Sequence, residues 1–118
     1  MSRDSILREK SIDFAVRIVK LCQYLENEKK EFKMSDQLHR SGTSIGANVC
    51  EGIYGQSRND FIAKLSIALK ETAETEYWLE VLYRTDYIIE KEYTSIRNDA
   101  GELAKMLIST LKTMRAKQ

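Results

Sequence analysis

The sequence contains no proline, and this absence favours long, uninterrupted helices. Proline removes a backbone N–H donor and kinks or ends a helix, so a chain without it meets no such break. Charged residues make up 31% of the 118 residues, and the good helix formers Leu, Ala, Lys and Glu are common. Strand-forming residues are not enriched. The composition therefore predicts an all-α protein and disfavours a β-rich one.

Histidine is nearly absent, which removes the common routes to catalysis. His39 is the single histidine, so a catalytic pair of His with Ser, Cys or a carboxylate could form only at this residue. A di-metal centre in a four-helix bundle needs two Glu-x-x-His pairs, and only one Asp36-x-x-His39 pair is present. Glycine-rich phosphate loops are missing too. We predict no catalytic residue, no metal site and no cofactor, with a carboxylate di-metal enzyme as a remote alternative.

The chain also lacks a long apolar run and an excess of one charge sign. No stretch approaches the ~20 apolar residues of a membrane span, and residues 1–9 are too charged for a secretory signal. Cys22 and Cys50 lie in apolar helical patterns, which is typical of buried thiols. We expect a soluble, cytoplasmic protein with no membrane partner. Its net charge of +1 gives no overall field to drive tight binding of nucleic acid.

Hydrophobic periodicity predicts four helices within a single domain over residues 1–118. Ser35 is expected to cap the second helix and Ser57 the third, because Ser accepts hydrogen bonds from a helix's first N–H groups. Short links make consecutive helices run up and down, so the pattern predicts an antiparallel up-down four-helix bundle. The predicted helices cover about 4–29, 35–54, 57–85 and 93–114, with a connection at 86–92.

The second helix is rich in glycine and carries a line of polar residues. Gly42 and Gly46 lie four residues apart, so a neighbouring helix can approach their bare backbones closely. The polar line is either a ligand groove or a hydrogen-bond network that fixes helix register, and we favour the network. Its members, with the glycine that ends the motif, are Arg40, Ser41, Ser44, Asn48, Glu51 and Gly52.

The third and fourth helices carry more apolar residues than one packed face requires. We expect this surplus to be shared between copies through a symmetric interface, although it could instead fill a broad monomer core. Tyr77 and Trp78 are predicted as core or interface anchors before base-stacking platforms. The expected interface residues are Tyr77, Trp78, Ala104, Ile108 and Leu111.

Cations gather on the first helix and near the end of the fourth. They either complement the dipole at a helix C-terminus or form basic edges that bind RNA or DNA. Several copies in one assembly would multiply this modest charge. The candidate nucleic-acid contacts are Arg17, Lys20, Lys105, Lys112 and Arg115.

Several stretches of the sequence resemble a known family. They are Leu38-His39-Arg40-Ser41-Gly42-Thr43-Ser44-Ile45-Gly46-Ala47-Asn48-Val49-Cys50-Glu51-Gly52, Asp60-Phe61, Ile67-Ala68-Leu69-Lys70-Glu71 and Glu74-Thr75-Glu76-Tyr77-Trp78-Leu79. These stretches resemble the bacterial four-helix-bundle family of proteins encoded in intervening sequences of 23S rRNA genes. The family also includes the accessory variability determinant of diversity-generating retroelements. The likeness covers nearly the whole chain, and the Arg-Ser-x-x-Ser-Ile-x-x-Asn-x-x-Glu-Gly run is quite specific.

The resemblance implies an up-down bundle that assembles into a homopentameric ring without known catalysis. The retroelement member is similar to a basic adaptor that binds RNA and a reverse transcriptase, whereas this chain is nearly neutral. We therefore expect a non-enzymatic, pentameric binding or scaffold protein that contacts nucleic acid through its basic edges. The alternative is a companion of a locally encoded protein partner, contacted through Tyr54, Tyr87 or Tyr93.

Overall fold

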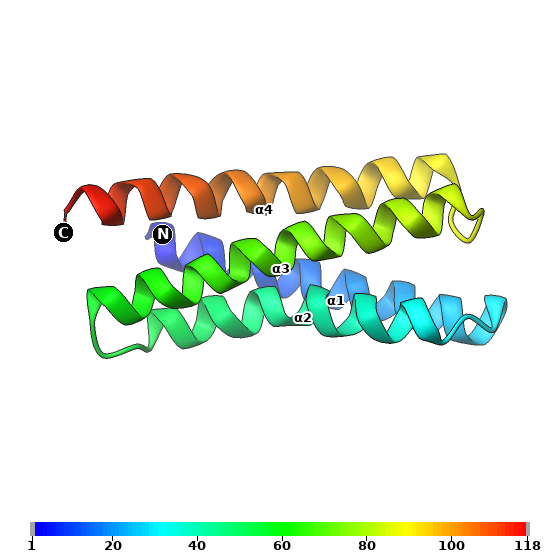
Figure 1. Cartoon of the computed structure of the whole chain (residues 1–118), viewed down its shortest axis with the longest axis horizontal. Helices are drawn as coiled ribbons and strands as arrows, with labels where there is room; N and C mark the ends of the chain where they lie inside the picture. Colours follow the sequence, from blue (N-terminus) through cyan, green and yellow to red (C-terminus); the bar gives the residue numbers. More distant parts are fainter. Residues whose placement is uncertain (1, 118) are drawn as a thin grey trace.

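The computed structural model describes residues 2–117, which form four long helices. Each helix runs antiparallel to the one before it, and both ends of the chain lie at the same end of the bundle (Figure 1). The all-α, up-down four-helix architecture expected from the sequence is confirmed. The helices are α1 (Arg3–Lys29), α2 (Lys33–Ile53), α3 (Arg58–Arg84) and α4 (Glu90–Ala116).

The start of α3 agrees with the sequence, whereas the start of α2 does not. The Ser57 hydroxyl accepts a hydrogen bond from the Asp60 N–H at 3.1 Å, as a capping serine should. At α2 the acceptor is Glu31, whose carboxylate lies 2.9 Å from the Met34 nitrogen and 3.1 Å from the Ser35 nitrogen. Ser35 is buried inside α2 instead, with its hydroxyl 3.4 Å from the Cys22 carbonyl. A buried carboxylate before the first turn does the capping there, because it also complements the helix dipole.

The α3–α4 connection is shorter than the sequence suggested. α4 begins at Glu90, three residues before the expected Tyr93. Asp86 takes a left-handed backbone conformation with φ 67°, and the Tyr87 N–H donates to the Leu82 carbonyl at 2.9 Å. This tight turn reverses the chain quickly, and Ile88 is then buried at 5% exposure. The first turn of α4 carries Glu90 and Glu92, which favour a helix N-terminus.

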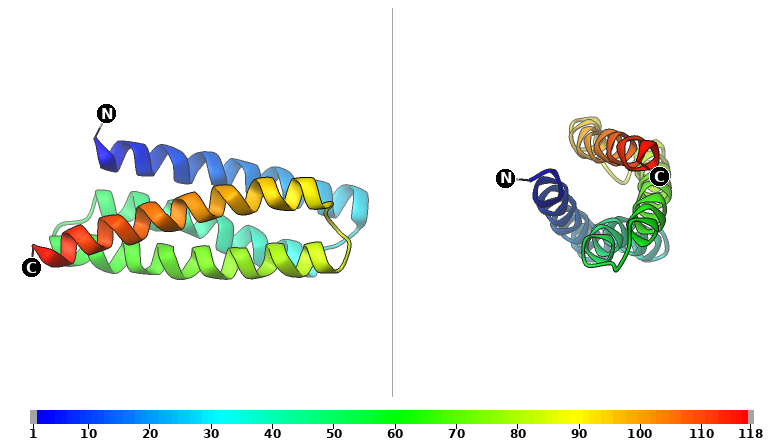
Figure 2. Two further views of the ribbon diagram at one scale, coloured as in Figure 1. Left: turned by 90° about the horizontal axis from the view of Figure 1, so that it is seen from above. Right: turned by 90° about the vertical axis from the view of Figure 1, so that its left-hand side faces the viewer.

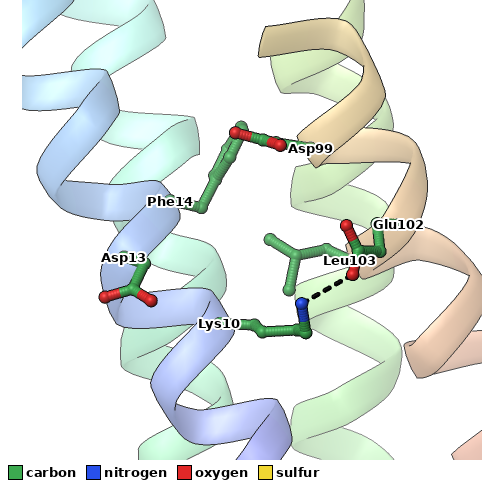
Figure 3. Close-up of a pocket in the computed structure, with 6 residues that line it drawn as sticks. All are labelled: Lys10, Asp13, Phe14, Asp99, Glu102 and Leu103. Carbon is green, nitrogen blue, oxygen red and sulfur yellow. Dashed lines mark hydrogen bonds and ion pairs between the residues drawn. The ribbon is translucent and has the colours of Figure 1, made fainter. Parts of the chain in front are cut away.

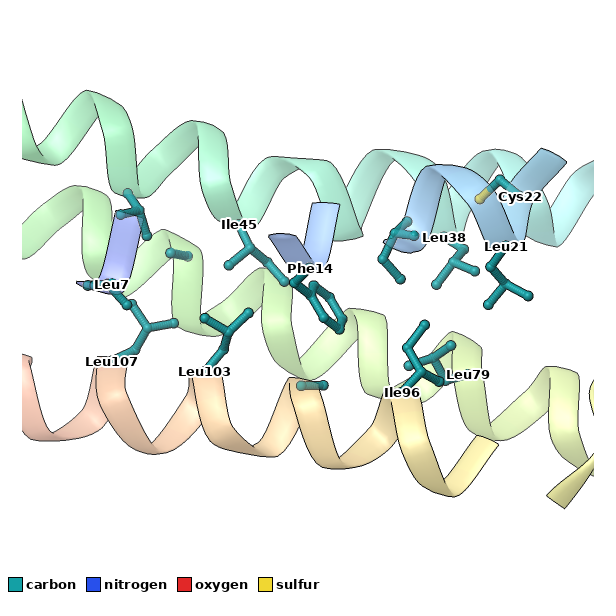
Figure 4. Close-up of a cluster of buried hydrophobic side chains, with 14 of the residues drawn as sticks. Leu7, Phe14, Leu21, Cys22, Leu38, Ile45, Leu79, Ile96, Leu103 and Leu107 are labelled. Carbon is teal, nitrogen blue, oxygen red and sulfur yellow. The ribbon is translucent and has the colours of Figure 1, made fainter. Parts of the chain in front are cut away.

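Apolar side chains from all four helices form one core along the bundle (Figure 4). They repeat at three- and four-residue steps, so each helix turns one stripe inward. Leu7 and Ile18 from α1, Ile45 from α2 and Leu79 from α3 are fully buried. The buried hydroxyls of Thr72 and Thr110 donate to carbonyls one turn earlier, which satisfies them without breaking the core.

The bundle is open along one edge. Consecutive helices pack extensively, while α1 and α4 pack much less against each other. Seen end on, the helices follow an open arc with α1 and α4 at its two tips (Figure 2). We refer to the edge between α1 and α4 as the α1–α4 seam. It leaves the outward sides of both helices available to other molecules.

Candidate functional site

The polar line of α2 lies at the interface with α3. The Arg40 guanidinium forms ion pairs with Glu71, at 3.2 Å, and with Glu74. Deeper in the interface, the buried Thr75 hydroxyl donates to the Ser41 hydroxyl at 3.0 Å. These bonds link two helices side by side, so they fix the register of α2 against α3.

The rest of the polar line makes contacts within α2 and with α3. The Asn48 amide donates to the Ser44 carbonyl at 2.8 Å within α2. Glu51 pairs with Lys64 of α3 at 3.5 Å. A Cβ built at Gly52 would lie 3.2 Å from both Leu65 and Lys64, so this glycine allows close approach of α3. These contacts are hydrogen bonds and ion pairs of the kind that fixes helix register, and Gly52 also lines a cavity at the end of the bundle.

An aromatic pair adjoins this network on α3, with Tyr77 exposed and Trp78 half-buried. The Trp78 indole N–H donates to Glu74 at 3.1 Å, and the Tyr77 ring meets the Trp78 ring edge-on at 4.9 Å. The hydrogen bond from Trp78, and then the one from Arg40, lower the pKa of Glu74 below its ordinary value. The same carboxylate raises the pKa of Arg40. Tyr77 is 58% exposed, so its ring is available to a partner.

The α1–α4 seam is bridged by ion pairs over an apolar floor. Lys10 donates to Glu102 at 2.6 Å, beside a cavity of about 190 Å³ lined by Phe14 and Leu103 (Figure 3). About two turns further along α1, Arg17 reaches Asp99 at 2.7 Å and Glu92 at 3.2 Å. These pairs hold α4 against α1 where apolar packing is thinnest.

Arg17 is consequently a structural cation rather than a free one. Burial acts to lower its pKa, but hydrogen bonds with Asp99 and Glu92 outweigh burial, so the pKa of Arg17 is raised overall. The Ser95 hydroxyl accepts a third hydrogen bond at 2.9 Å. With two carboxylates already at its guanidinium, Arg17 has little left to offer a phosphate.

The structure divides the five predicted nucleic-acid contacts into two groups. Arg17 and its exposed neighbour Lys20 lie opposite the first half of α4, whereas Lys105, Lys112 and Arg115 lie towards its end. Lys105 and Arg115 follow Ser95, the partner of Arg17, by ten and twenty residues. At 1.5 Å per residue these intervals span about 15 and 30 Å. The α1 and α4 cations therefore do not form one strip.

A second set of cations collects where α1 and α3 begin and α4 ends. Of the eight arginines, five form ion pairs, but Arg3, Arg58 and Arg115 have no carboxylate partner within residues 2–117. Arg58 donates to the Lys117 carbonyl at 2.6 Å and Arg115 to the Ser66 hydroxyl at 3.2 Å. This group could not be recognised from the sequence, because its members come from three segments that are far apart along the chain. We call it the basic end, formed by Arg3, Arg58, Lys112, Arg115 and Lys117.

An apolar groove runs along the outside of α1 and α2. It has a volume of about 480 Å³, and Val16 on its wall is 49% exposed. Its floor includes Gly46, where the two helices approach closely, and Cys50 lies along it. The α1–α2 groove is lined by Ile12, Ala15, Val16, Val19, Lys20, Gln23, Thr43, Gly46, Ala47 and Cys50.

The sequence placed the surplus apolar surface elsewhere, on α3 and α4. A signal for the groove was present, because Ile12, Ala15, Val16 and Val19 follow the three- and four-residue steps of a second apolar stripe on α1. That stripe lies beside the core stripe rather than on it. The apolar arc of α3 is longer and gives the stronger pattern, so the sequence did not single out the groove on α1 and α2.

Of the residues on α3 and α4 that were predicted to form an interface between copies, some lie on the surface and one lies in the core. Tyr77 and Ile108 are 58% and 53% exposed, and Trp78 and Ala104 are half-buried. Leu111 needs correction, because it is 2% exposed and belongs to the core. It lies one turn after Leu107, on the side of α4 that faces the other helices.

The three tyrosines expected to contact a protein partner differ in how exposed they are. Tyr93 stacks on Tyr83 with ring centres 4.5 Å apart, and Tyr87 packs partly buried against the core. Tyr54 alone of the three is largely free, with 78% exposure at the end of α2.

The groups that would carry catalysis are dispersed. Asp36 and His39 are both exposed on α2, and residues 2–117 contain no cluster of three His, Cys, Asp or Glu side chains suited to a metal ion. Cys22 is 1% exposed, and burial raises the pKa of its thiol to about 11. Cys50, expected to be buried, is half-exposed. Across the described helices, none combines the length and apolarity that crossing a membrane would require.

Comparison with known proteins agrees with this architecture. The family model described as 23S rRNA-intervening sequence protein matches residues 3–109. A solved structure from Bacteroides thetaiotaomicron, described as a protein with unknown function from the S23 ribosomal protein family, is 58% identical. The match covers 94% of this chain and 99% of that chain, with a TM-score of 0.92. A search of the curated proteins found no match. The chain therefore belongs to the 23S rRNA-intervening sequence protein family.

Proposed function

We propose that this protein is a non-enzymatic scaffold that assembles into a homopentameric ring in the cytoplasm and binds nucleic acid. The observation that carries the assembly is the α1–α2 groove. An apolar groove of about 480 Å³ on a monomer surface is costly to leave in water, so an apolar partner that fills it is stabilising.

A second copy of the chain can fill the groove, because exposed apolar side chains lie on other faces of the same bundle. Tyr77 on α3 and Ile108 on α4 are more than half exposed, and neither lines the groove. Pairing of one surface with a different surface on the next copy is head-to-tail, and such contacts close into a ring when the rotation between successive copies divides a full turn, as it does in a pentamer. The subunit number of five follows the family resemblance.

The absence of enzymatic activity is proposed from the placement of the reactive groups. Cys22 is buried, and its raised pKa keeps the thiol protonated near neutral pH, so it is a poor nucleophile. His39 faces solvent on α2. A nucleophile and base within hydrogen-bond reach are needed for covalent catalysis, and these two side chains do not meet that need.

The assembly is tested by placing a charge in the groove. Val16→Glu puts a carboxylate on the groove wall and is expected to reduce the particle to a monomer, because moving a carboxylate out of water into an apolar interface is unfavourable. Ile89→Glu is the matched control, since Ile89 is 71% exposed and lies outside the groove. Sedimentation velocity should show Ile89→Glu assembled like the wild type. An assembled Val16→Glu particle would contradict the groove as the interface.

A protein partner in place of nucleic acid is the second candidate, and the exposure of Tyr54 favours it. Aromatic side chains are common anchors at protein interfaces. Binding of this kind would depend little on salt, whereas phosphate contacts weaken steeply as salt increases.

A further inference from the structure

We propose that the basic end of the bundle is a binding site for single-stranded nucleic acid, a proposal that rests on the nucleic-acid-binding role suggested above. The site comprises Arg3, Arg58, Lys112, Arg115 and Lys117, with Tyr54 as an aromatic platform. Compared with the contacts predicted from the sequence, this site omits Arg17 and Lys20 of α1 and keeps the cations at the end of α4.

The topology of the fold brings these residues together. α1 and α3 begin, and α2 and α4 finish, at the end of the bundle where both chain ends lie (Figures 1 and 2). The hydrogen bond from Arg58 to the Lys117 carbonyl at 2.6 Å joins the start of α3 to the end of α4. A cavity of about 410 Å³ between the helix ends is lined by Arg3, Gly55, Ser57 and Lys117, among others. Arg3, Arg58 and Lys117 thus share one end surface.

The charge at this end is not cancelled. Lys64 and Arg8 nearby are paired with Glu51 and Glu9 and contribute little net charge. The carboxylates in the first turns of α1 and α3 are Asp4 and Asp60. Five cations against these two carboxylates leave three positive charges in excess. The whole chain carries only +1, so the remainder of the molecule is acidic and the field is concentrated at this end.

The chemistry of the group suits phosphates. Arg58 and Arg115 are held by a carbonyl and a hydroxyl rather than by carboxylates, so their orientation is fixed while their charge is retained. Guanidinium groups have further N–H donors in a planar fork that matches phosphate oxygens. The cations are spread over a bundle end of about 23 × 21 Å, which favours an extended polyanion over one compact anion.

The exposed ring of Tyr54 favours a single strand over a duplex as the ligand. This ring is 78% exposed and lies in the turn next to Ile53 and Gly55, which line the end cavity. An exposed aromatic ring beside cations can stack on any unpaired base, whereas the bases of a duplex are already stacked. Few other apolar side chains are exposed at this end, so a membrane surface is a poorer fit.

The ring would multiply the site. In any cyclic assembly equivalent residues of every copy lie at the same height along the axis, so five basic ends would form one ring around it. A strand that reaches from one copy to the next then gains affinity through a high local concentration of sites.

The test is fluorescence anisotropy with a labelled oligouridine about fifteen nucleotides long, titrated with the full-length protein at low and raised salt. The end variant combines Arg58→Gln, Lys112→Gln and Lys117→Gln. The matched control removes three exposed cations at the opposite end, as Lys29→Gln, Lys33→Gln and Lys91→Gln. Both variants change the net charge equally. The molar mass of each sample is also measured by light scattering, so that loss of assembly is recognised.

The end variant is expected to bind at least tenfold more weakly, with a shallower salt dependence, while the control variant binds within about twofold of the wild type. Tyr54→Ala should weaken binding about tenfold without changing the salt slope. Equal losses in the two triple variants, no binding by the wild type, or equal affinity for a duplex of the same length would each overturn the proposal. A wild type that binds through the basic end as a monomer would support the site and refute the ring.

Discussion

The side chain of Ile18 in α1 occupies the space beside Gly42 in α2 where any larger residue would place its first carbon. A Cβ built at Gly42 would lie 2.7 Å from Ile18 Cγ2, and Ile18 itself is fully buried. Gly46, one turn on, leaves 3.3 Å to the Ser11 carbonyl. The two glycines let α1 and α2 approach closely, and the floor of the α1–α2 groove depends on that approach.

Gly42→Ala is therefore expected to destabilise the fold although alanine is the better helix former. The clash with a fully buried side chain costs about 1–3 kcal/mol, which outweighs a helix-propensity gain of about 1 kcal/mol. Gly101→Ala is the control, because no atom lies within 4 Å of its Cβ position, and it should stabilise by up to about 1 kcal/mol. Urea unfolding measures both. A stabilised Gly42→Ala would show that α1 and α2 are not packed this closely.

Glu31 should prove the capping residue of α2. Its carboxylate accepts from the backbone N–H groups of Met34 and Ser35, so Glu31→Ala is expected to cost about 1 kcal/mol in unfolding free energy. Glu28→Ala, at an exposed carboxylate near the end of α1, is the comparison and should change stability by no more than about 0.5 kcal/mol. If the two variants unfold alike in urea, the cap at Glu31 is not operating.

The burial of Cys22 predicts a loss of stability in alkali. Burial raises the pKa of this thiol from an ordinary 9.0 to about 11, so the unfolded chain loses its proton at lower pH than the folded chain. The contribution of the protonated thiol is complete below about pH 9 and is lost as the pH rises towards 11, amounting to roughly 3 kcal/mol at most. Denaturant midpoints measured across this range should fall further in the wild type than in Cys22→Ala. Parallel curves would contradict the burial of the thiol.

Cys50 provides an independent report on the α1–α2 groove. It is half-exposed in the monomer and lines the groove, so a second copy seated there would cover it. In a Cys22→Ala background, a thiol reagent should react at least tenfold more slowly with the assembled protein than with the Val16→Glu monomer. The Ile89→Glu variant should stay slow. Equal rates in all three proteins would mean that the groove is open in the assembly.

The fold was predictable because the signals for it are local. Four apolar stripes, a proline-free chain and the Ser57 cap follow from the order of residues alone. The starts of α2 and α4 were missed for physical reasons. Glu31 caps α2 from before the helix, where glutamate is not a standard cap, and the left-handed Asp86 shortens the connection to α4.

The candidate binding surfaces were less predictable because they join residues from different helices. Arg17 has the sequence context of a surface cation, but its partners Glu92 and Asp99 lie on α4, so only the fold shows that it is neutralised. The basic end depends likewise on the meeting of Arg3 and Arg58 with the end of α4. Charge counted along the chain cannot reveal which cations have partners.

Assembly is the claim on which the proposed role of the groove, the protection of Cys50 and the ring of basic ends all depend. Light scattering on a sizing column measures it directly, across a range of protein concentrations. The account predicts a particle of five 13.7 kDa chains, or about 68 kDa, that persists on dilution. A stable particle of 13.7 kDa at the highest concentration would contradict it.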